Sequence, residues 1–197
     1  MKKLGITGGI GSGKTYICQL LKQRGIPVYH CDDEAKRLMV EDATIREKLT
    51  QLLGTEAYIG NQLNKPVIAR YLFADSEHAR QINGIVHPVV KQDFSQWANQ
   101  QDAPIVVQEC ALLFETGFQD TVDDTIEVYA PQSIRLERAM RRDLASSEQI
   151  LARMAQQMDE EEKRLRADHC IINDGIADLD VQIDRILQKI AEQNEKL

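Results

Sequence analysis

The stretch that decides the fold is Gly8-Gly9-Ile10-Gly11-Ser12-Gly13-Lys14-Thr15, near the start of a chain of 197 residues. Its spacing matches the P-loop pattern G-x-x-x-x-G-K-T fully. Its context also fits, because Lys3 to Thr7 reads as a short buried strand and Gly13 to Gln23 reads as a helix. The stretch therefore predicts a loop that binds a nucleoside triphosphate between a strand and a helix.

Each part of this motif has a physical task. Glycines let the backbone curl so that successive N–H groups point at phosphate oxygens, and the start of the helix adds positive partial charge. We expect Lys14 to reach the β- and γ-phosphates and the Thr15 hydroxyl to bind Mg²⁺, so the expected ligand is ATP with magnesium. The alternative is a glycine-rich turn with an incidental lysine, which the strand–helix setting disfavours.

Strands and helices alternate outward from the loop. We expect further strands at 26–31, 105–107, 125–129 and 170–172. The helices expected between and after them lie at about 133–142 and 179–192, with two short helices in the polar stretch 143–168. This alternation predicts an α/β fold with a central parallel sheet that helices cover on both sides.

The segment from Asp42 to Gln101 has a mostly helical pattern of apolar residues. We expect His87-Pro88 to interrupt it and a new helix to start at Pro88. Before it, Asp32 is expected to cap a helix from Asp33 to about Val40.

Composition narrows the class of protein. The formal charge of −7 argues against non-specific nucleic-acid binding, where a basic face is expected. No apolar run approaches the length of a membrane span and no signal peptide is readable, so we expect a cytoplasmic protein. The four cysteines form no C-x-x-C pair and are expected to pack as small apolar residues: Cys18, Cys31, Cys110 and Cys170.

Sequence features outside the loop indicate the reaction class. A GTPase switch usually carries D-x-x-G and N-K-x-D, but no aspartate here has glycine three residues later, and Asn64-Lys65 is followed by Pro66-Val67. A kinase with a mobile lid fits better, because phosphoryl transfer must exclude water. Arginines that could serve such a lid lie on the helix after Pro131: Arg135, Arg138, Arg141 and Arg142.

Arg138 and Arg142 are four residues apart and share a helix face, so they could neutralise charge on the transferring phosphoryl group. The alternative is a solvated face with Glu137 and Asp143 as partners. Asp32 follows the second strand, at the edge where open α/β sheets build their sites. It could accept the acceptor hydroxyl's proton, help hold Mg²⁺ or serve as a helix cap.

Ordered segments carry a more specific likeness. Thr7 to Lys14 reads T-G-G-I-G-S-G-K, and His30-Cys31-Asp32 stands where a D-A-D motif would lie. Four more segments follow: Ile82 to Pro88, Glu109 to Glu115, Arg138 to Asp143, and Lys163 to Asp168 with Ile172 to Gly175. In these motifs the chain resembles the dephospho-coenzyme A kinase family over nearly its whole length.

The resemblance implies transfer of the ATP γ-phosphate to the ribose 3′-hydroxyl of dephospho-CoA, which gives coenzyme A in the last step of its biosynthesis. It implies a P-loop kinase three-layer sandwich with a core of residues 1–31, 102–137 and 167–197. It also implies a helical acceptor-binding domain at 32–101 and a lid at 138–166. ATP, dephospho-CoA and Mg²⁺ are then the expected ligands, without nucleic-acid or membrane partners, and a monomer is favoured.

The same resemblance assigns roles to single residues. Asp32, as the base, Lys14 and the lid residue Arg142 are the expected catalytic residues, and Thr15 and Asp32 the expected metal ligands. Asn173 to Gly175 would flank the adenine. The expected ATP-binding residues are Gly9, Ile10, Gly11, Ser12, Gly13, Lys14, Thr15, Tyr16, Arg138, Asn173 and Gly175. The expected acceptor-binding residues are Asp32, His87, Leu112 and Glu115, with a purely structural histidine as the alternative for His87.

Three positions depart from the family's pattern: His30 replaces an acid, Glu109 replaces an aspartate and Ala111 replaces a proline. None removes an expected catalytic residue, so we expect activity. Two other functions stay open on the sequence. One is an adenylate-kinase-like enzyme that acts on a nucleotide or another small hydroxyl acceptor, and the other is a nucleotide-binding regulator without transfer activity.

Overall fold

The computed structural model describes residues 1–194, with side chains to residue 192. The chain divides into two compact units. The sheet unit comprises Met1–Tyr29 and Gln101–Leu197, and the helical unit comprises His30–Gln100. Each unit is built around its own apolar core.

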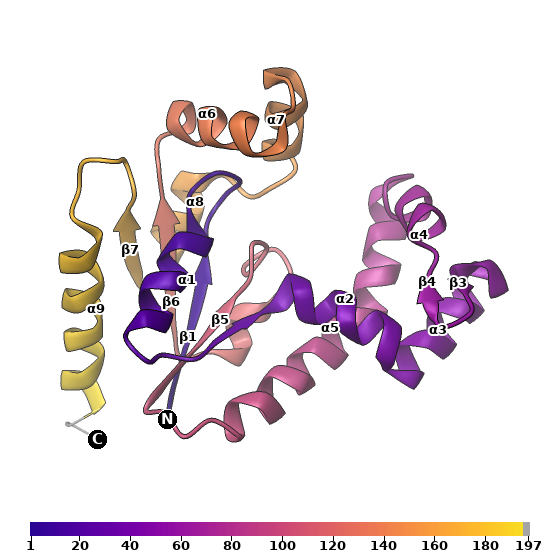
Figure 1. The fold of residues 1–197 in the computed structure, drawn as a ribbon, viewed down its shortest axis with the longest axis horizontal. Helices are drawn as coiled ribbons and strands as arrows, with labels where there is room; N and C mark the ends of the chain where they lie inside the picture. Colours follow the sequence, from indigo (N-terminus) through magenta and orange to yellow (C-terminus); the bar gives the residue numbers. More distant parts are fainter. Residues whose placement is uncertain (195–197) are drawn as a thin grey trace. The chain divides into compact units, whose positions relative to one another are not determined.

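A five-stranded sheet organises the sheet unit, in the order β2-β5-β1-β6-β7. Figure 1 labels β5, β1, β6 and β7 of this sheet. β1 pairs in parallel with β5 and β6, and β6 pairs in parallel with β7. The bounds are β1 Lys2–Thr7, β2 Val28–His30, β5 Ile105–Glu109, β6 Asp124–Tyr129 and β7 His169–Ile172. The strands expected from the sequence are confirmed, and β1 lies at the centre, where the loop that follows it has a strand on either side.

One face of the sheet is apolar and carries the core. The register sets Leu4 beside Val107 and Ile6 beside Ile126. Helices α1 (Lys14–Gln23) and α9 (Leu179–Asn194) bury their apolar stripes against this face. Fully buried members of this core are Leu4, Ile6, Ile17, Val107, Val128 and Ile190. Burial of apolar area on this scale is the main stabilisation of the unit.

The opposite face carries small and polar residues. A Cβ on Gly5 would meet Val122 at 3.0 Å and Leu113 at 3.1 Å, so the segment after β5 packs closely there. Gln108 Oε1 accepts a hydrogen bond from the Thr121 hydroxyl at 2.7 Å. Helix α8 (Glu160–Arg166) packs against β6, whose Glu127 lies on the α8 side of the sheet and is fully buried. Helical layers on both faces make this the expected three-layer sandwich.

Helices α6 (Gln132–Asp143) and α7 (Ser147–Met154) follow β6 and pack on each other. Figure 1 shows them beyond the carboxyl ends of β6 and β7. Ser146 and Gln149 form a capping box at the start of α7, and Asp159 caps α8. The expectation of short helices within 143–168 is thus confirmed.

The helical unit contains α2 (Cys31–Glu41), α3 (Ala43–Leu53), α4 (Lys65–Leu72) and α5 (Ser76–Asn99). Each of the first three packs against α5. The 3₁₀ turn η1 (Thr55–Ala57) and a short hairpin of β3 (Tyr58–Ile59) and β4 (Gln62–Leu63) join α3 to α4. The sequence did not predict this hairpin, which turns at Gly60 in the left-handed region with φ 59°.

Two expectations about helix ends were wrong. Helix α5 runs through Pro88 without a break. A proline inside a helix costs about 3 kcal/mol, from a lost hydrogen bond and the clash of its ring with the preceding turn. The buried stripe of α5 runs on both sides of Pro88, so packing outweighs this cost. Asp32 is not a helix cap either, because α2 already begins at Cys31 and His30 is its N-cap.

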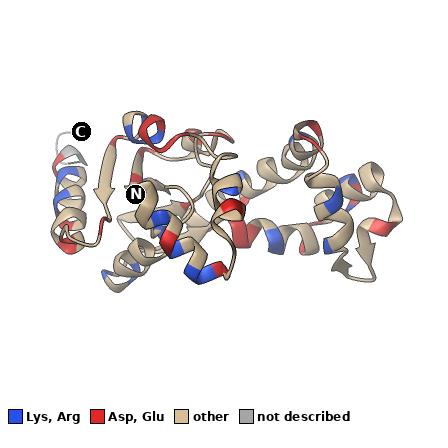
Figure 2. Ribbon diagram, turned by 90° about the horizontal axis from the view of Figure 1, so that it is seen from above, with Lys and Arg blue, Asp and Glu red and all other residues tan. Residues whose placement is uncertain are grey.

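Charged residues of both signs lie on the helices of each unit. Figure 2 shows acidic and basic residues intermixed along the helices of each unit. Cys18, Cys31 and Cys110 are buried as free thiols, as expected, and Cys170 is half-buried. Among residues 1–194, no helix is both long enough and apolar enough to cross a membrane.

Candidate active site

The loop after β1 ends in an open helix start. Ser12 N donates to the Gly9 carbonyl at 3.1 Å, and Tyr16 N and Ile17 N both donate to Gly13 O. In the part of the chain that the structure describes, no side chain caps α1, and no acidic residue lies in its first turn. The positive end of this helix is therefore available to an anion.

Close packing explains why two loop positions are glycine. A Cβ on Gly11 would lie 2.2 Å from the Arg135 carbonyl oxygen, and one on Gly13 would lie 2.2 Å from Asn173 Nδ2. Both residues also have positive φ, 80° and 96°. Any side chain here would strain the backbone and push the loop away from its neighbours.

Lys14 lies folded onto the loop. Its Nζ donates to the carbonyl oxygens of Gly8 at 2.6 Å and Gly9 at 3.4 Å. Burial lowers the pKa of Lys14, and the nearby Glu109 carboxylate opposes that shift. Thr15 and Tyr16 are exposed beside it at the helix start. A cation and a hydroxyl are thus placed together on the open side of the loop.

Asn173 braces the loop from the end of β7. Its Nδ2 donates to Ser12 O at 2.7 Å, and the side chain is only 7% exposed. Arg138 Nη1 donates to the Asn173 carbonyl at 2.9 Å. Gly175 follows with φ 86° and lies near the Arg138 guanidinium. The structure therefore brings Arg138, Asn173 and Gly175 together with the loop.

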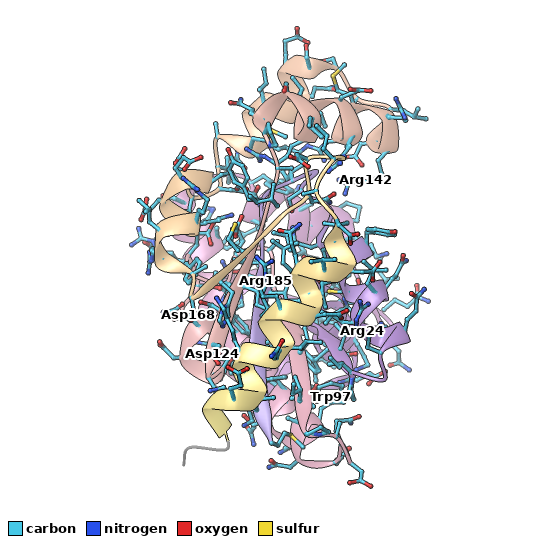
Figure 3. The ribbon with its side chains drawn as sticks, turned by 90° about the vertical axis from the view of Figure 1, so that its left-hand side faces the viewer. Arg24, Trp97, Asp124, Arg142, Asp168 and Arg185 are labelled. Atoms are coloured by element: carbon cyan, nitrogen blue, oxygen red, sulfur yellow. The ribbon has the colours of Figure 1, made fainter. Side chains whose placement is uncertain are left out.

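The other arginines of α6 divide between interior and surface. Arg135 is buried and donates to Ala130 O at 3.0 Å. Arg142 is exposed, and its Nε donates to Asp143 Oδ1 at 2.6 Å, a bond that raises the pKa of Arg142. Arg141 pairs with Glu137 on the surface at 2.9 Å. Figure 3 shows Arg142 at the α6 end of the unit, well away from Asp124 and Asp168 at the amino ends of β6 and β7.

Two buried acids were not assigned a role from the sequence. Glu109 ends β5 and Glu127 lies near the end of β6, so both flank β1 on the edge from which the loop emerges. The Glu109 carboxylate raises the pKa of Lys14, and Glu127 does so more weakly when it is ionised. The sequence signal that could have found them is an acidic residue within or at the end of a mainly buried strand. Burying a charge costs free energy, so such a residue is expected to be paired or to serve the site.

Glu115 and Leu112 lie in the segment after β5. The Glu115 carboxylate accepts from Met158 N at 2.9 Å and lies 3.4 Å from Lys163 Nζ. Its contacts among the described residues are thus with the segment that leads into α8. Leu112 is 36% exposed.

Asp32 and His87 belong to the helical unit. Asp32 lies in the first turn of α2 and is exposed, and His87 lies within α5. Burial, followed by the nearby Lys91 charge, lowers the pKa of His87 to about 4. His87 is therefore neutral at pH 7 and can offer an anion a hydrogen bond but no positive charge.

The site also fits magnesium bound with its nucleotide. Among the described residues, no group of three or more His, Cys, Asp or Glu side chains could hold a metal by itself. Mg²⁺ in kinase sites keeps several waters and uses one or two protein ligands plus substrate phosphates. The exposed Thr15 hydroxyl suits such a site, with Glu109 near the same loop.

Known proteins match this chain over most of its length. The family model for dephospho-CoA kinase matches residues 3–178. Dephospho-CoA kinase from Bacteroides fragilis is 50% identical over 196 residues, which cover 99% of this chain and 94% of the relative. Dephospho-CoA kinase from Porphyromonas gingivalis is 39% identical, and the match covers 96% of this chain and 95% of the relative.

Solved structures agree with this match. A Thermus thermophilus protein superposes with a TM-score of 0.82 at 35% identity, covering 98% of this chain and 97% of its own. Shikimate kinase from Acinetobacter baumannii shares the P-loop kinase fold, with a TM-score of 0.57 at 17% identity over 98% of this chain and 94% of its own. By its sequence over nearly the full length and by its fold, this chain belongs to the dephospho-CoA kinase family.

Proposed function

We propose that this protein transfers the γ-phosphate of ATP to the ribose 3′-hydroxyl of dephospho-CoA and so makes coenzyme A. The observation that carries the proposal is the coincidence of a complete phosphate loop with a family match over residues 3–178. The loop supplies a donor site, and the family supplies the acceptor. The chain is thus an enzyme that completes coenzyme A biosynthesis.

On the donor side, the open start of α1 and the Lys14 ammonium bind the phosphates. Lys14 already touches the loop carbonyls of Gly8 and Gly9, so it needs little reorganisation to meet a phosphate. Thr15 holds Mg²⁺, which, when bound, neutralises phosphate charge. Tyr16 and the inner loop amides complete the ATP contacts, and Asn173 and Gly175 flank the adenine.

On the acceptor side, Asp32 orients the 3′-hydroxyl and takes up its proton as the oxygen attacks the γ-phosphorus. The bond between that phosphorus and the β–γ bridging oxygen breaks, and ADP leaves. A loose transition state needs little help from a base, so orientation is the larger part of the role of Asp32. Asp32 is also proposed as a ligand of Mg²⁺, and His87, Leu112 and Glu115 contribute to acceptor binding.

Residues 138–166 act as the lid, with 32–101 as the acceptor domain. Arg138 already contacts Asn173 beside the loop. Arg142 is held on the surface by Asp143, which also accepts from Arg153 at 2.7 Å. A solvent-exposed ion pair contributes little to stability, so the phosphates of ATP can compete for Arg142 when the lid closes.

A panel of acceptors with labelled ATP tests the function. We expect phosphate transfer to dephospho-CoA in strong preference to AMP and to other small alcohols. Preference for AMP would instead identify an adenylate-kinase-like enzyme. ATP binding without transfer to any acceptor would identify a regulator. We expect the active species to be a monomer, which sedimentation of the purified protein checks.

A further inference from the structure

The outer side of the phosphate loop is held by the segment that leads into α8. Gly9 N donates to Glu160 Oε2 at 3.1 Å, and Ile10 N donates to Gln157 Oε1 at 2.9 Å. Two consecutive loop amides are therefore bound by side chains only three residues apart. A Cβ on Gly9 would lie 2.3 Å from Glu160 Oε1 and 2.5 Å from Arg135 Nη1, so this contact is tight.

Glu160 is a buried residue with opposite charges around it. It is only 8% exposed, and its Oε1 lies 3.6 Å from Lys163 Nζ and 3.8 Å from Arg135 Nη1. Lys163 is fully buried and also pairs with Glu115 at 3.4 Å. A charged group buried at this depth is held in one place, because leaving it unpaired is costly.

Glu127 completes the cluster from the sheet. It is fully buried, and among the described residues no N–H group donates to either of its oxygens. Burial first, and then the Glu160 charge, raise the pKa of Glu127 to about 9. A protonated Glu127 keeps its proton and can donate an O–H hydrogen bond to the Glu160 carboxylate, whose Oε2 accepts the Gly9 N–H.

We propose that Glu160 and Gln157 are positioning residues that fix the Gly9–Ile10 peptides and thereby the shape of the phosphate loop. The segment 157–163 then stays with the loop during turnover. Opening of the proposed lid is confined to the part before it, residues 138–156. This inference rests on the proposed function only in taking the loop as the ATP site.

We call the two hydrogen bonds from Gly9 N to Glu160 and from Ile10 N to Gln157 the clamp. The rates of amide hydrogen exchange at Gly9 and Ile10, measured by NMR on the nucleotide-free protein, report on the clamp directly. We expect Gln157→Ala to speed exchange at Ile10, and Glu160→Ala to speed exchange at Gly9, by about tenfold each, as the loss of one hydrogen bond predicts. Glu160→Gln keeps an acceptor oxygen and should restore most of the Gly9 protection. Glu162→Ala, on the exposed side of α8, is the matched control and should change neither amide.

Steady-state kinetics separate positioning from general stability. In Gln157→Ala and Glu160→Ala the KM for ATP should rise several-fold, about tenfold at most, while kcat and the KM for dephospho-CoA stay near those of the unmodified protein. Gln157 is partly exposed and carries no charge, so we expect Gln157→Ala to fold. This variant therefore tests the positioning role even if Glu160→Ala fails to fold. Unchanged Ile10 exchange together with an unchanged KM for ATP in Gln157→Ala would overturn the proposal.

The exchange experiment uses neither ATP nor an acceptor. If the unmodified protein prefers another acceptor while the amides respond as expected, the proposed function fails and the clamp stands. If transfer to dephospho-CoA is efficient while neither alanine variant changes amide exchange at Gly9 or Ile10, the clamp fails and the proposed function stands.

Discussion

The side-chain amide of Asn173 donates to the carbonyl oxygen of Ser12 at 2.7 Å, across 161 residues of sequence. This bond ties the end of β7 to the turn that precedes α1. The Asn173 Nδ2 lies only 2.2 Å from the place that a Cβ of residue 13 would take, so the loop and its brace fit only with glycine there. The shape of the phosphate site thus depends on strand β7 as well as on the motif itself.

We expect Gly13→Ala to abolish measurable ATP binding. The new Cβ would overlap Asn173 Nδ2, and alanine would have to adopt φ 96°. Calorimetric titration with ATP checks this. Gly60→Ala is the control, because Gly60 also has positive φ, 59°, but its Cβ would meet nothing within 4 Å. Both changes should lower the free energy of unfolding by about 1 kcal/mol from backbone strain, and only Gly13→Ala should lose ATP.

Lys14→Met should reduce kcat by about a hundredfold or more, as loss of one preorganised charge at a reacting phosphate does. Methionine fills the same space without a charge, and burial already disfavours the charge of Lys14. The free energy of unfolding in urea should therefore not fall. Turnover within a few-fold of normal would exclude Lys14 from phosphoryl transfer.

Asp32→Asn should lower kcat by about a hundredfold, the usual scale for a proton-accepting group. Asp33→Asn is the matched control, because Asp33 is the next residue of α2, is likewise exposed and is paired with Lys36 at 2.8 Å. Turnover of purified variants with dephospho-CoA checks the pair. Equal effects at the two positions would remove the special role of Asp32.

Glu127→Gln should flatten the pH dependence of stability. The pKa of Glu127 is raised to about 9 in the fold, against 4.5 as its ordinary value. Between these values the folded carboxyl keeps a proton that the unfolded chain has lost, so the free energy of unfolding falls as pH rises. Glutamine cannot ionise and should raise that free energy at pH 8 by about 1–3 kcal/mol.

Urea unfolding at pH 6 and pH 9 measures this effect. Glu162→Gln, at an exposed position of α8, should leave the difference between the two pH values unchanged. A pH dependence in Glu127→Gln identical to that of the unmodified protein would show that Glu127 is not the group responsible.

The phosphate loop was predictable because its function depends on local backbone geometry. One short stretch of sequence contains the glycines, Lys14 and the strand and helix on either side of them, so the pattern specifies the structure. The sheet followed from apolar runs for the same reason. The course of α5 through Pro88 was not predictable locally, because packing with the rest of the helical unit decides it.

The supports of the loop are long-range and could not be derived from spacing. Glu160 and Lys163 look like ordinary charged residues in the sequence, and only the fold brings Glu160 to Gly9 and pairs it with Lys163. Glu160 reaches the loop across 151 residues. Arg142 shows the converse, since a residue expected at the phosphates is held on the surface by the adjacent Asp143.

Release of ADP by the purified protein with ATP, Mg²⁺ and dephospho-CoA tests the central claim most directly, with coenzyme A quantified in the same sample. The account predicts that ADP release depends on dephospho-CoA and that one coenzyme A forms for each ADP. ADP release that is indifferent to dephospho-CoA, or faster with AMP in its place, would contradict it.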